Sequence, residues 1–575
     1  MYCQFDFLRR CFPQTEDILR ALDGLPETLD GTYARILEEI DKPKQKYAHI
    51  FFQCVAAASR PLRVDELSQF LAFDFEAEST PTFRADRLPA DPADTVVSMC
   101  SSLLAVVKPE GYDFPVVQFA HFSVKEYLTS TRLAEAKNAI SRFHVSMTAA
   151  HTTVAQGCLG LLLHLDETVT EDSLKNFPLA EYSAEYWVAH AQIEDVSLKV
   201  EYGMKRLFDP SKHHLSVWVW IYDPEDCEHR FYYERYEEAR ATPLHYATYC
   251  GMHDVVKFLI VEHSQDVNTL CFFDQETPLH VASRCGHADI AQLLLEHGAD
   301  ANARDAEERT PLHLPSEYGD VKVVWILLER GADTEARDAR LHQSPLFKAS
   351  ERGHVEVCRL LLEHNADVKS EDNLGFTPLH FADGEEVAGL LLKHGADANA
   401  LDNDGRSPLH HLSYLGHLGA ARVLLEHGVD SNTRDADNAT PLHMTTDFPF
   451  RSPSGHEDWT DVARLLLQYG SDIHARDNEG RTPFMRAAAR GNVDTIRLLF
   501  EYGSDIHARD NGGLTPFMIA AARGNDDIMR VLLECGSDIH ARDNGGRTPF
   551  MRATALGEYD IMWLLLEYGA EDHRK

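Results

Sequence analysis

The chain has 575 residues, which is long enough for several domains with a large buried core. Apolar residues make up 44% of it, as in ordinary globular proteins. No stretch approaches 18 consecutive apolar residues, and the first residues lack a basic start followed by a long apolar run, so we expect neither a membrane-spanning helix nor a secretory signal. The net charge of −37 opposes a general affinity for nucleic acid or for anionic membranes.

The eleven cysteines are scattered and form no C-x-x-C pair. This usage is typical of buried free thiols in a reducing compartment and not of a disulfide framework. We therefore predict a cytoplasmic location.

Residues 1–40 are predicted to be helical, and residues 41–135 to form a small winged-helix domain. In the second region, helices are followed by two strand-like segments, 103–107 and 115–120, and then by a helix that begins at Ser123. Helices that lead into such a hairpin are typical of a winged helix.

A winged helix suggests the hypothesis of DNA binding, but the charge opposes it. Residues 41–135 carry 10 basic and 13 acidic residues, and the expected recognition helix, 64–70, is acidic at its start. We therefore expect no nucleic-acid partner and interpret this helix as packed between domains. Residues 136–238 are predicted to form a helical bridge, in which aromatic residues such as Tyr186 and Trp187 belong to the core.

The second half of the chain, 239–575, is a repeat array. A Thr or Ser, then Pro, then Leu or Phe recurs at spacings of 30 to 42 residues, most often 33. A period of 33 with the pattern T-P-L-H-x-A is the signature of ankyrin repeats. The ten anchors are Thr242, Thr277, Thr310, Ser344, Thr377, Ser407, Thr440, Thr482, Thr515 and Thr548. We therefore predict a mainly α fold, in which an ankyrin-repeat α-solenoid of about ten repeats follows the winged-helix domain and the helical bridge.

The residues of one repeat explain why the units form an array. Thr277 can cap a helix whose first turn holds Pro278, and Leu279 and Ala282 then share one face of that helix. One such unit cannot bury its apolar face alone, so stacked neighbours make a continuous core.

Two repeats depart from the period. The step after Thr377 is 30 residues, which predicts the loss of about one helical turn, and the step after Thr440 is 42 residues. The inserted segment carries Phe448, Phe450 and Trp459, which would either contact a partner or fold back on their own repeat.

The last three repeats are close copies whose differences cluster at a few positions. Framework positions stay the same while loop-tip and helix-surface positions change, which favours an array whose exposed face specifies partners. Neutral drift of exposed positions is the alternative. The candidate partner-binding residues are Glu479, Arg481, Arg486, Arg490, Arg497, Leu514, Ile519, Arg523, Arg530, Arg547, Arg552 and Trp563.

The arginines of this set stand out because residues 239–575 carry 32 basic but 54 acidic residues. They would bind an acidic segment of a partner, or they would pair internally with Asp494, Asp510 or Asp527.

The many histidines do not indicate a metal site or an active site. His280 and its equivalents are expected to make hydrogen bonds that tie neighbouring loops together. His474, His507 and His540 recur at 33-residue steps, but packed helices lie about 8–10 Å apart, too far for donors that must each lie about 2 Å from a zinc ion. Every possible nucleophile or base recurs with the repeat. We therefore expect no enzyme, no catalytic residue, no cofactor and no small-molecule substrate.

Several short segments of the first half, together with the repeats, resemble one known family. They are residues 3–11 (CQFDFLRRC), 25–37 (LPETLDGTYARIL), 60–62 (RPL), 121–128 (HFSVKEYL) and the stretch around Tyr186-Trp187. They are similar to the region after the nucleotide-binding domain in fungal NACHT–ankyrin proteins, which are relatives of NOD-like receptors.

In that family the nucleotide-binding domain precedes the first of these segments. The Walker A pattern G-x-x-x-x-G-K-[S/T] needs a Gly-Lys pair, which this sequence lacks, so ATP-driven switching is not carried over. We interpret the chain as either a naturally shortened relative or an incomplete gene model. The family's winged helix is also similar to one named after a lipid inositol deacylase, but G-x-S-x-G is absent, so the resemblance implies no hydrolase activity.

These features predict a non-enzymatic intracellular scaffold that binds protein partners through the loop tips and the concave helix face of the array. The resemblance would make it the sensor half of a receptor-like protein in innate immune or self/non-self recognition. The alternative is a signalling component that needs a nucleotide-binding NACHT region supplied upstream or in trans.

Overall fold

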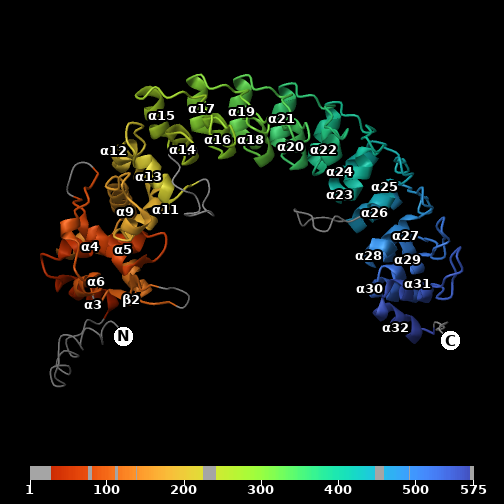
Figure 1. Cartoon of the computed structure of the whole chain (residues 1–575), viewed down its shortest axis with the longest axis horizontal. Helices are drawn as coiled ribbons and strands as arrows, with labels where there is room; N and C mark the ends of the chain where they lie inside the picture. The colour runs from red at the N-terminus through yellow and green to blue at the C-terminus, as the bar shows by residue number, and fades with distance from the viewer. Residues whose placement is uncertain are drawn as a thin grey trace. The chain divides into compact units, whose positions relative to one another are not determined.

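The computed structural model describes residues 28–75, 80–100, 102–109, 114–136, 139–224, 241–446, 459–490 and 493–569 (Figure 1). These residues fall into two compact units that meet in sequence between Phe273 and Asp274. The segment 3–11 and the aromatic residues Phe448 and Phe450 of the insertion lie outside the described residues.

The first unit holds a three-stranded antiparallel sheet in the order β1-β3-β2. The hairpin expected from the sequence is present as β2 (Leu104–Val107) and β3 (Val116–Phe119). The short strand β1 (Leu62–Arg63) pairs with the other edge of β3 and places Leu62 opposite Val117. Two residues are too few to show an alternating pattern, so β1 could not be predicted from the sequence.

Helices make up most of the first unit, and α9 packs against both α4 and α11. The helices are α3 (Leu29–Glu38), α4 (Gln45–Ala57), α5 (Val64–Gln69), α6 (Pro92–Cys100), α7 (Phe122–Leu128), α8 (Thr131–Ala134), α9 (Met147–Leu162), α10 (Glu171–Leu174), α11 (Leu179–Ala191), α12 (Ser197–Leu207), α13 (His214–Ile221), α14 (Pro243–Tyr249) and α15 (His253–Val261), with 3₁₀ turns at Phe70–Ala72, Ala85–Arg87 and Ala139–Phe143.

The helix α5 occupies the place of a recognition helix but is packed inside the unit. Glu66 is fully buried and forms ion pairs with Arg60 at 2.7 Å and with Arg63 at 3.0 Å. The side-chain oxygen of Gln69 accepts a hydrogen bond from the backbone N–H of Leu179, at the start of α11. Because these polar groups are bonded to neighbouring elements, the structure supports the interpretation of α5 as a packing helix.

The first ankyrin repeat, α14 and α15, is part of the first unit. Trp218 contacts Tyr246 edge to face, with 6.4 Å between the ring centroids. The side-chain amide of Gln192 donates to the carbonyl of Cys250 at 2.9 Å. The compact unit therefore extends past the predicted domain limit at residue 238 and ends at Phe273.

The second unit is a row of helix pairs, one pair for each of repeats 2 to 10. The first helices are α16 (Pro278–Arg284), α18 (His313–Tyr318), α20 (Pro345–Glu351), the 3₁₀ helix η4 (Pro378–Phe381), α23 (Pro408–Leu415), α25 (Pro441–Met444), α27 (Pro483–Arg490), α29 (Pro516–Ala522) and α31 (Pro549–Leu556). The second helices are α17 (Ala288–Glu296), α19 (Val321–Glu329), α21 (Val355–Glu363), α22 (Glu385–Lys393), α24 (Leu418–Glu426), α26 (Trp459–Gln468), α28 (Val493–Glu501), α30 (Asp526–Glu534) and α32 (Tyr559–Glu567).

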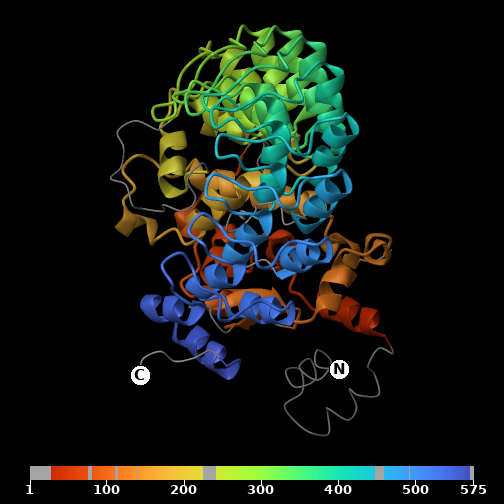
Figure 2. The same ribbon diagram turned by 90° about the vertical axis from the view of Figure 1, so that its right-hand side faces the viewer.

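These helices form two layers along the row. In Figure 1, α16, α18 and α20 lie in one layer and α17, α19 and α21 in the other, and the turned view shows that the connecting loops of these repeats project together on one side (Figure 2). The 30-residue step shortens the first helix of repeat 5 to the single turn η4, as the spacing predicts.

A histidine in the first helix ties each of several repeats to the next. The backbone N–H of Thr277 donates to Nδ1 of His280, so Nδ1 is the unprotonated nitrogen of the neutral ring. The proton then lies on Nε2, which donates to the carbonyl of Arg309 in the following repeat at 3.1 Å. The same bond joins His313 to Gln343, His380 to Arg406, His410 to Ala439 and His443 to Arg481. The expected bonds between neighbouring loops are thus present.

Because these histidines are buried and neutral, we expect the free energy of unfolding of the array to fall in mild acid. Burial lowers the pKa of His280, His313, His380, His410 and His443, to about 4 for His313 and His443. Because the unfolded chain takes up protons near pH 6.5 and the folded array does not, the free energy of unfolding falls as pH drops from 6.5 toward 5. The slope is about 1.4 kcal/mol per pH unit for each fully titrating histidine.

Denaturant unfolding of the whole chain at pH 7.5, 6.5, 5.8 and 5.0 measures this slope. His443→Met, which installs the residue found at this position in repeats 8 to 10, removes one histidine and is expected to flatten the slope by about one proton. A midpoint that stays constant over this range, or an unchanged slope in the variant, would contradict the assignment.

Candidate protein-binding surface of the last three repeats

Repeats 8 to 10 have methionine in place of the bridging histidine, and their loops keep two side-chain bonds of a kind also found in earlier repeats, for example from Arg434 to the carbonyl of Arg476 and from Asn403 to that of Asn373. The guanidinium of Arg476 donates to the carbonyl of Arg509 at 2.6 Å, and the side-chain amide of Asn511 donates to the carbonyl of Asn478 at 2.9 Å. The same two bonds recur one repeat later, from Arg509 and Asn544. These contacts fix the backbone of the loops without using the side chains that differ between the copies.

Two neighbouring positions change their chemistry together among repeats 8, 9 and 10. They are the residue immediately before the anchor Thr or Ser and the residue four positions after it, and we call them the variable pair of each repeat. The variable pairs of repeats 8, 9 and 10 are Arg481 and Arg486, Leu514 and Ile519, and Arg547 and Arg552. All six are among the residues that the sequence singles out.

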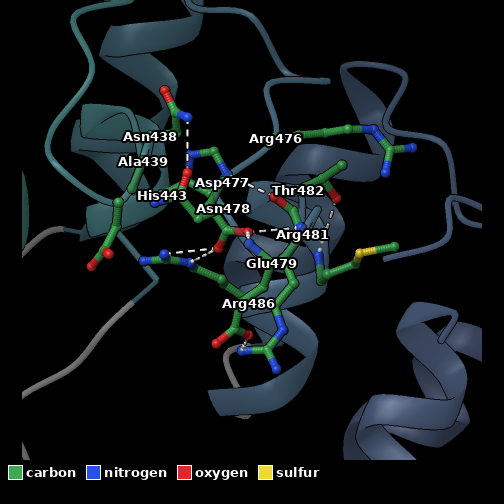
Figure 3. A network of polar contacts seen from close by, with 12 residues as sticks. Asn438, Ala439, His443, Arg476, Asp477, Asn478, Glu479, Arg481, Thr482 and Arg486 are labelled. Carbon is green, nitrogen blue, oxygen red and sulfur yellow. Dashed lines mark hydrogen bonds and ion pairs between the residues drawn. The ribbon is translucent and has the colours of Figure 1, made fainter. Parts of the chain in front are cut away.

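In repeat 8 the variable pair is engaged with acidic residues of its own loop (Figure 3). One carboxylate oxygen of Asp477 accepts the backbone N–H groups of Glu479 and Arg481, at 3.0 and 2.8 Å. The other accepts a hydrogen bond from Nε of Arg486 at 2.9 Å and forms an ion pair with Nη2 of the same guanidinium at 2.8 Å. Arg481 forms an ion pair with Glu479. Arg486 therefore stabilises the loop through its contacts with Asp477, and we say that such an arginine braces the loop.

Repeat 10 has the same arrangement around Asp543. The guanidinium of Arg552 lies 2.6 Å from the carboxylate and that of Arg547 lies 3.2 Å from it. Burial would raise the pKa of Asp543, but the hydrogen bonds from the backbone N–H of Arg547 and from the side chain of Arg552 outweigh it and lower the pKa to about 2.

Repeat 9 differs because its variable pair is apolar. Ile519 is buried and packs with Met485 and Ala508, while Leu514 lies partly buried against this cluster. The carboxylate of Asp510 accepts only backbone N–H groups and forms no ion pair with any described residue. An apolar strip thus lies between two arginine-braced loops.

The remaining predicted site residues are exposed. Arg497 reaches Glu534 of the next repeat at 3.2 Å, whereas Arg523 and Arg530 form no ion pair within the described part of the chain. Trp563, in α32, is 73% exposed. Glu479 and Arg490 are also exposed.

The internal pairing of the arginines is therefore real, but it uses other carboxylates than those expected from the sequence. Within the described residues, the ion pairs found for these arginines use Asp477, Glu479, Glu534 and Asp543, and none of those found uses Asp494, Asp510 or Asp527. Sequence reasoning missed the turn aspartates because they are the same in every copy and so carry no signal of variation.

The described residues contain no group of three or more His, Cys, Asp or Glu side chains placed to hold a metal ion. None of the helices in the described ranges is long and apolar enough to cross a bilayer.

The brace on Asp543 yields a direct prediction. Replacing Arg552 by Gln removes charge-assisted hydrogen bonds from a carboxylate that is almost fully buried, so we expect a loss of about 1.5–3 kcal/mol in the free energy of unfolding at pH 7. Because the folded pKa is below the unfolded one, the loss should shrink as pH falls from about 4 toward 2. Denaturant unfolding measures both effects. Arg523→Gln serves as the control because Arg523 forms no ion pair with any residue that the structure describes, and equal losses in the two variants would contradict the role assigned to Arg552.

Comparison with family models agrees with this architecture. Models described as ankyrin repeats match residues 244–338, 335–402, 383–448 and 506–575, and further ankyrin models match 465–517 and 437–478. A model described as the winged-helix domain of GPI inositol-deacylase matches residues 37–141.

One curated protein is similar over a long stretch. "Azaphilone pigments biosynthesis cluster protein L" of Monascus ruber is 31% identical over 258 residues, which are 43% of this chain and 54% of that protein. The chain thus matches about half the length of this relative. Together, the matches and the observed fold show that the chain combines a winged-helix domain of the GPI inositol-deacylase type with an array of ankyrin repeats.

Proposed function

We propose that this protein is a non-enzymatic scaffold whose ankyrin array binds a protein partner, and that the variable pairs and exposed arginines of repeats 8 to 10 select that partner. Ankyrin repeats support a role in protein–protein interaction. The proposal adds the part of the array that does the selecting.

The contrast between fixed backbone and changing side chains carries this proposal. In repeats 8 to 10 the same Arg and Asn bonds hold each loop, while the variable pairs alternate between two arginines, two apolar residues and two arginines. A surface that keeps its geometry and changes its chemistry is suited to recognition of one extended partner by several adjacent repeats.

The internal ion pairs reduce the number of arginines that are available to a partner. Arg486 and Arg552 are occupied by turn aspartates, so Arg523 and Arg530 are better placed to meet an acidic segment. Neutral drift of exposed positions explains variation at Arg523 but not the paired change at Leu514 and Ile519, where two neighbouring positions become apolar together.

We further propose that the chain acts as the sensor part of a receptor-like protein. The support is the winged-helix match at 37–141 beside the ankyrin array, the order in which the resembling family places them. A signalling component that needs a nucleotide-binding NACHT region upstream or in trans is the competing proposal. Reading the full-length transcript from its 5′ end separates them: an in-frame Walker A segment upstream favours the second.

Charge reversal tests the selecting surface. The double variant Arg523→Glu and Arg530→Glu of the whole chain should lose at least tenfold in affinity for a partner captured by the wild-type chain, because like charges would face the acidic segment. Arg422→Glu is the matched control, since Arg422 is exposed on α24 and has no ion pair in the described residues. The readout is the partner's dissociation constant at low and physiological salt. Equal affinity of wild type and double variant would rule out this surface.

A further inference from the structure

The variable pair of repeat 7 is unlike that of its neighbours. It consists of Ala439 and Met444, so this pair supplies no cation to the turn aspartate of repeat 7, Asp435. In the same places repeat 8 has Arg481 and Arg486. Repeat 7 therefore lacks the arginine that lies beside the turn aspartate in repeat 8.

A cavity of about 320 Å³ opens at this place. Its size is that of a small ligand-binding pocket and would admit one long side chain. The cavity is lined by Arg406, His410, His411, Tyr414, Asp435, Asp437, Met444 and Arg486.

Asp435 is buried and incompletely paired. One of its carboxylate oxygens accepts the backbone N–H groups of Asp437 and Ala439, at 2.9 and 2.7 Å. The other has Arg406 of the preceding repeat as its nearest cation, 3.7 Å away. In repeats 8 and 10 the equivalent oxygen has an arginine nitrogen at 2.8 and 2.6 Å. The carboxylate of Asp435 thus has room for a closer donor.

His411 adds a second acceptor to the cavity. It is 91% buried, and its Nδ1 donates to the carbonyl of His380 at 3.0 Å, which leaves the lone pair on Nε2 of the neutral ring. Burial lowers the pKa of His411 to about 3, so the ring is neutral at pH 7. Nε2 has no hydrogen-bond partner among the described residues, and the ring lines the cavity.

The charges around the cavity favour a cation. The two guanidinium groups of the lining already lie against carboxylates outside it, Arg406 at 3.2 Å from Asp404 and Arg486 at 2.8 Å from Asp477. The lining carboxylate of Asp435 has no closer cation than Arg406 at 3.7 Å among the described residues. The carboxylate of Asp437 is exposed and has no ion pair in the described part of the chain. A ligand with several N–H donors and a positive charge would satisfy Asp435, Asp437 and His411 together.

We propose that this cavity binds an arginine side chain of the protein partner, whose guanidinium takes the place on Asp435 that Arg486 takes on Asp477 and Arg552 on Asp543. Arginine fits better than lysine because the acceptors surround the cavity and match a planar group with five donors. This inference rests on the proposed function, and it deepens that function by naming the group of the partner that is recognised.

The probe for this site is the blocked tripeptide acetyl-Gly-Arg-Gly-amide. Saturation-transfer NMR with the whole chain should show binding of this tripeptide, and about tenfold weaker binding of the tripeptides that carry citrulline or lysine in place of arginine. Citrulline has the same shape without the charge. Equal binding of the citrulline peptide would overturn the proposal. Tighter binding of free arginine than of the blocked peptide would show that the site takes the free amino acid and not an arginine within a polypeptide, which would also overturn it.

Variants of Met444 test the site without emptying the core. Met444→Arg supplies the missing guanidinium from the chain itself and should abolish binding of the tripeptide while the protein stays folded, as the equivalent Arg486 and Arg552 do in their repeats. Met444→Leu keeps the volume and the absence of charge, and it should bind as the wild type does. Asp437→Asn should weaken binding about five- to tenfold, with Glu426→Gln on the second helix as its charge-matched control.

The outcomes separate this inference from the proposed function. If the tripeptide does not bind the wild type, or binds Met444→Arg equally well, the cavity is not an arginine site, whatever the partner does. If the tripeptide behaves as expected but Met444→Arg leaves partner affinity unchanged, the partner's arginine does not use the cavity and the inference is wrong. If Met444→Arg weakens partner binding and the double arginine variant does not, the inference holds and the selecting surface of repeats 8 to 10 is wrong.

Discussion

The hydrogen bond from a first-helix histidine to the carbonyl of the next repeat is the contact on which the array depends. Its acceptor is the carbonyl of the first residue of the next variable pair, for example Arg309, Ala439 or Arg481. The backbone of that residue is therefore fixed by the preceding repeat, while its side chain is free to change. Ala439 and Arg481 can occupy the same place in the fold because neither side chain takes part in holding it.

Repeats 8 to 10 keep a second set of bonds between loops, which repeats with the histidine also have, for example from Arg304 to Arg337 and from Arg434 to Arg476. Where the histidine is absent, an arginine and an asparagine of each loop bond to carbonyls of the neighbouring loop. Arginine consequently has two distinct roles in this region. Arg476 and Arg509 hold loops together, and Arg486 and Arg552 neutralise buried turn aspartates, so most of the local positive charge is used within the protein. Only a few exposed cations remain for a partner.

The pairing of the turn aspartates also explains the cavity in repeat 7. A turn aspartate is buried whether or not its repeat supplies an arginine, because its first oxygen is needed to close the turn. Where the variable pair is Ala439 and Met444, the second oxygen and the space beside it are left to Arg406 and to the cavity. Where it is Leu514 and Ile519, the apolar side chains cover the surface.

The sequence predicted the repeats, their helix pairs and the hairpin of the winged helix, because the anchors, the helical periodicity and the strand pattern are local signals. It did not predict β1, which is only two residues long, or the membership of the first repeat in the first unit, which depends on contacts such as Trp218 with Tyr246. Among the site residues, the variable positions were visible in the three copies. The sequence did not show which arginines form internal ion pairs. Asp477 and Arg486 are nine residues apart and meet only when the loop folds back on its helix.

Hydrogen–deuterium exchange of the whole chain, with and without a captured partner, tests whether the variable pairs face the partner. If the variable pairs face the partner, exchange should slow on binding in the loops that carry these pairs, 435–446, 476–486, 509–519 and 542–552, and around Arg530 on α30, with little change in the second helices α17, α19 and α21. Protection confined to those second helices, or to residues 28–224, would contradict this expectation.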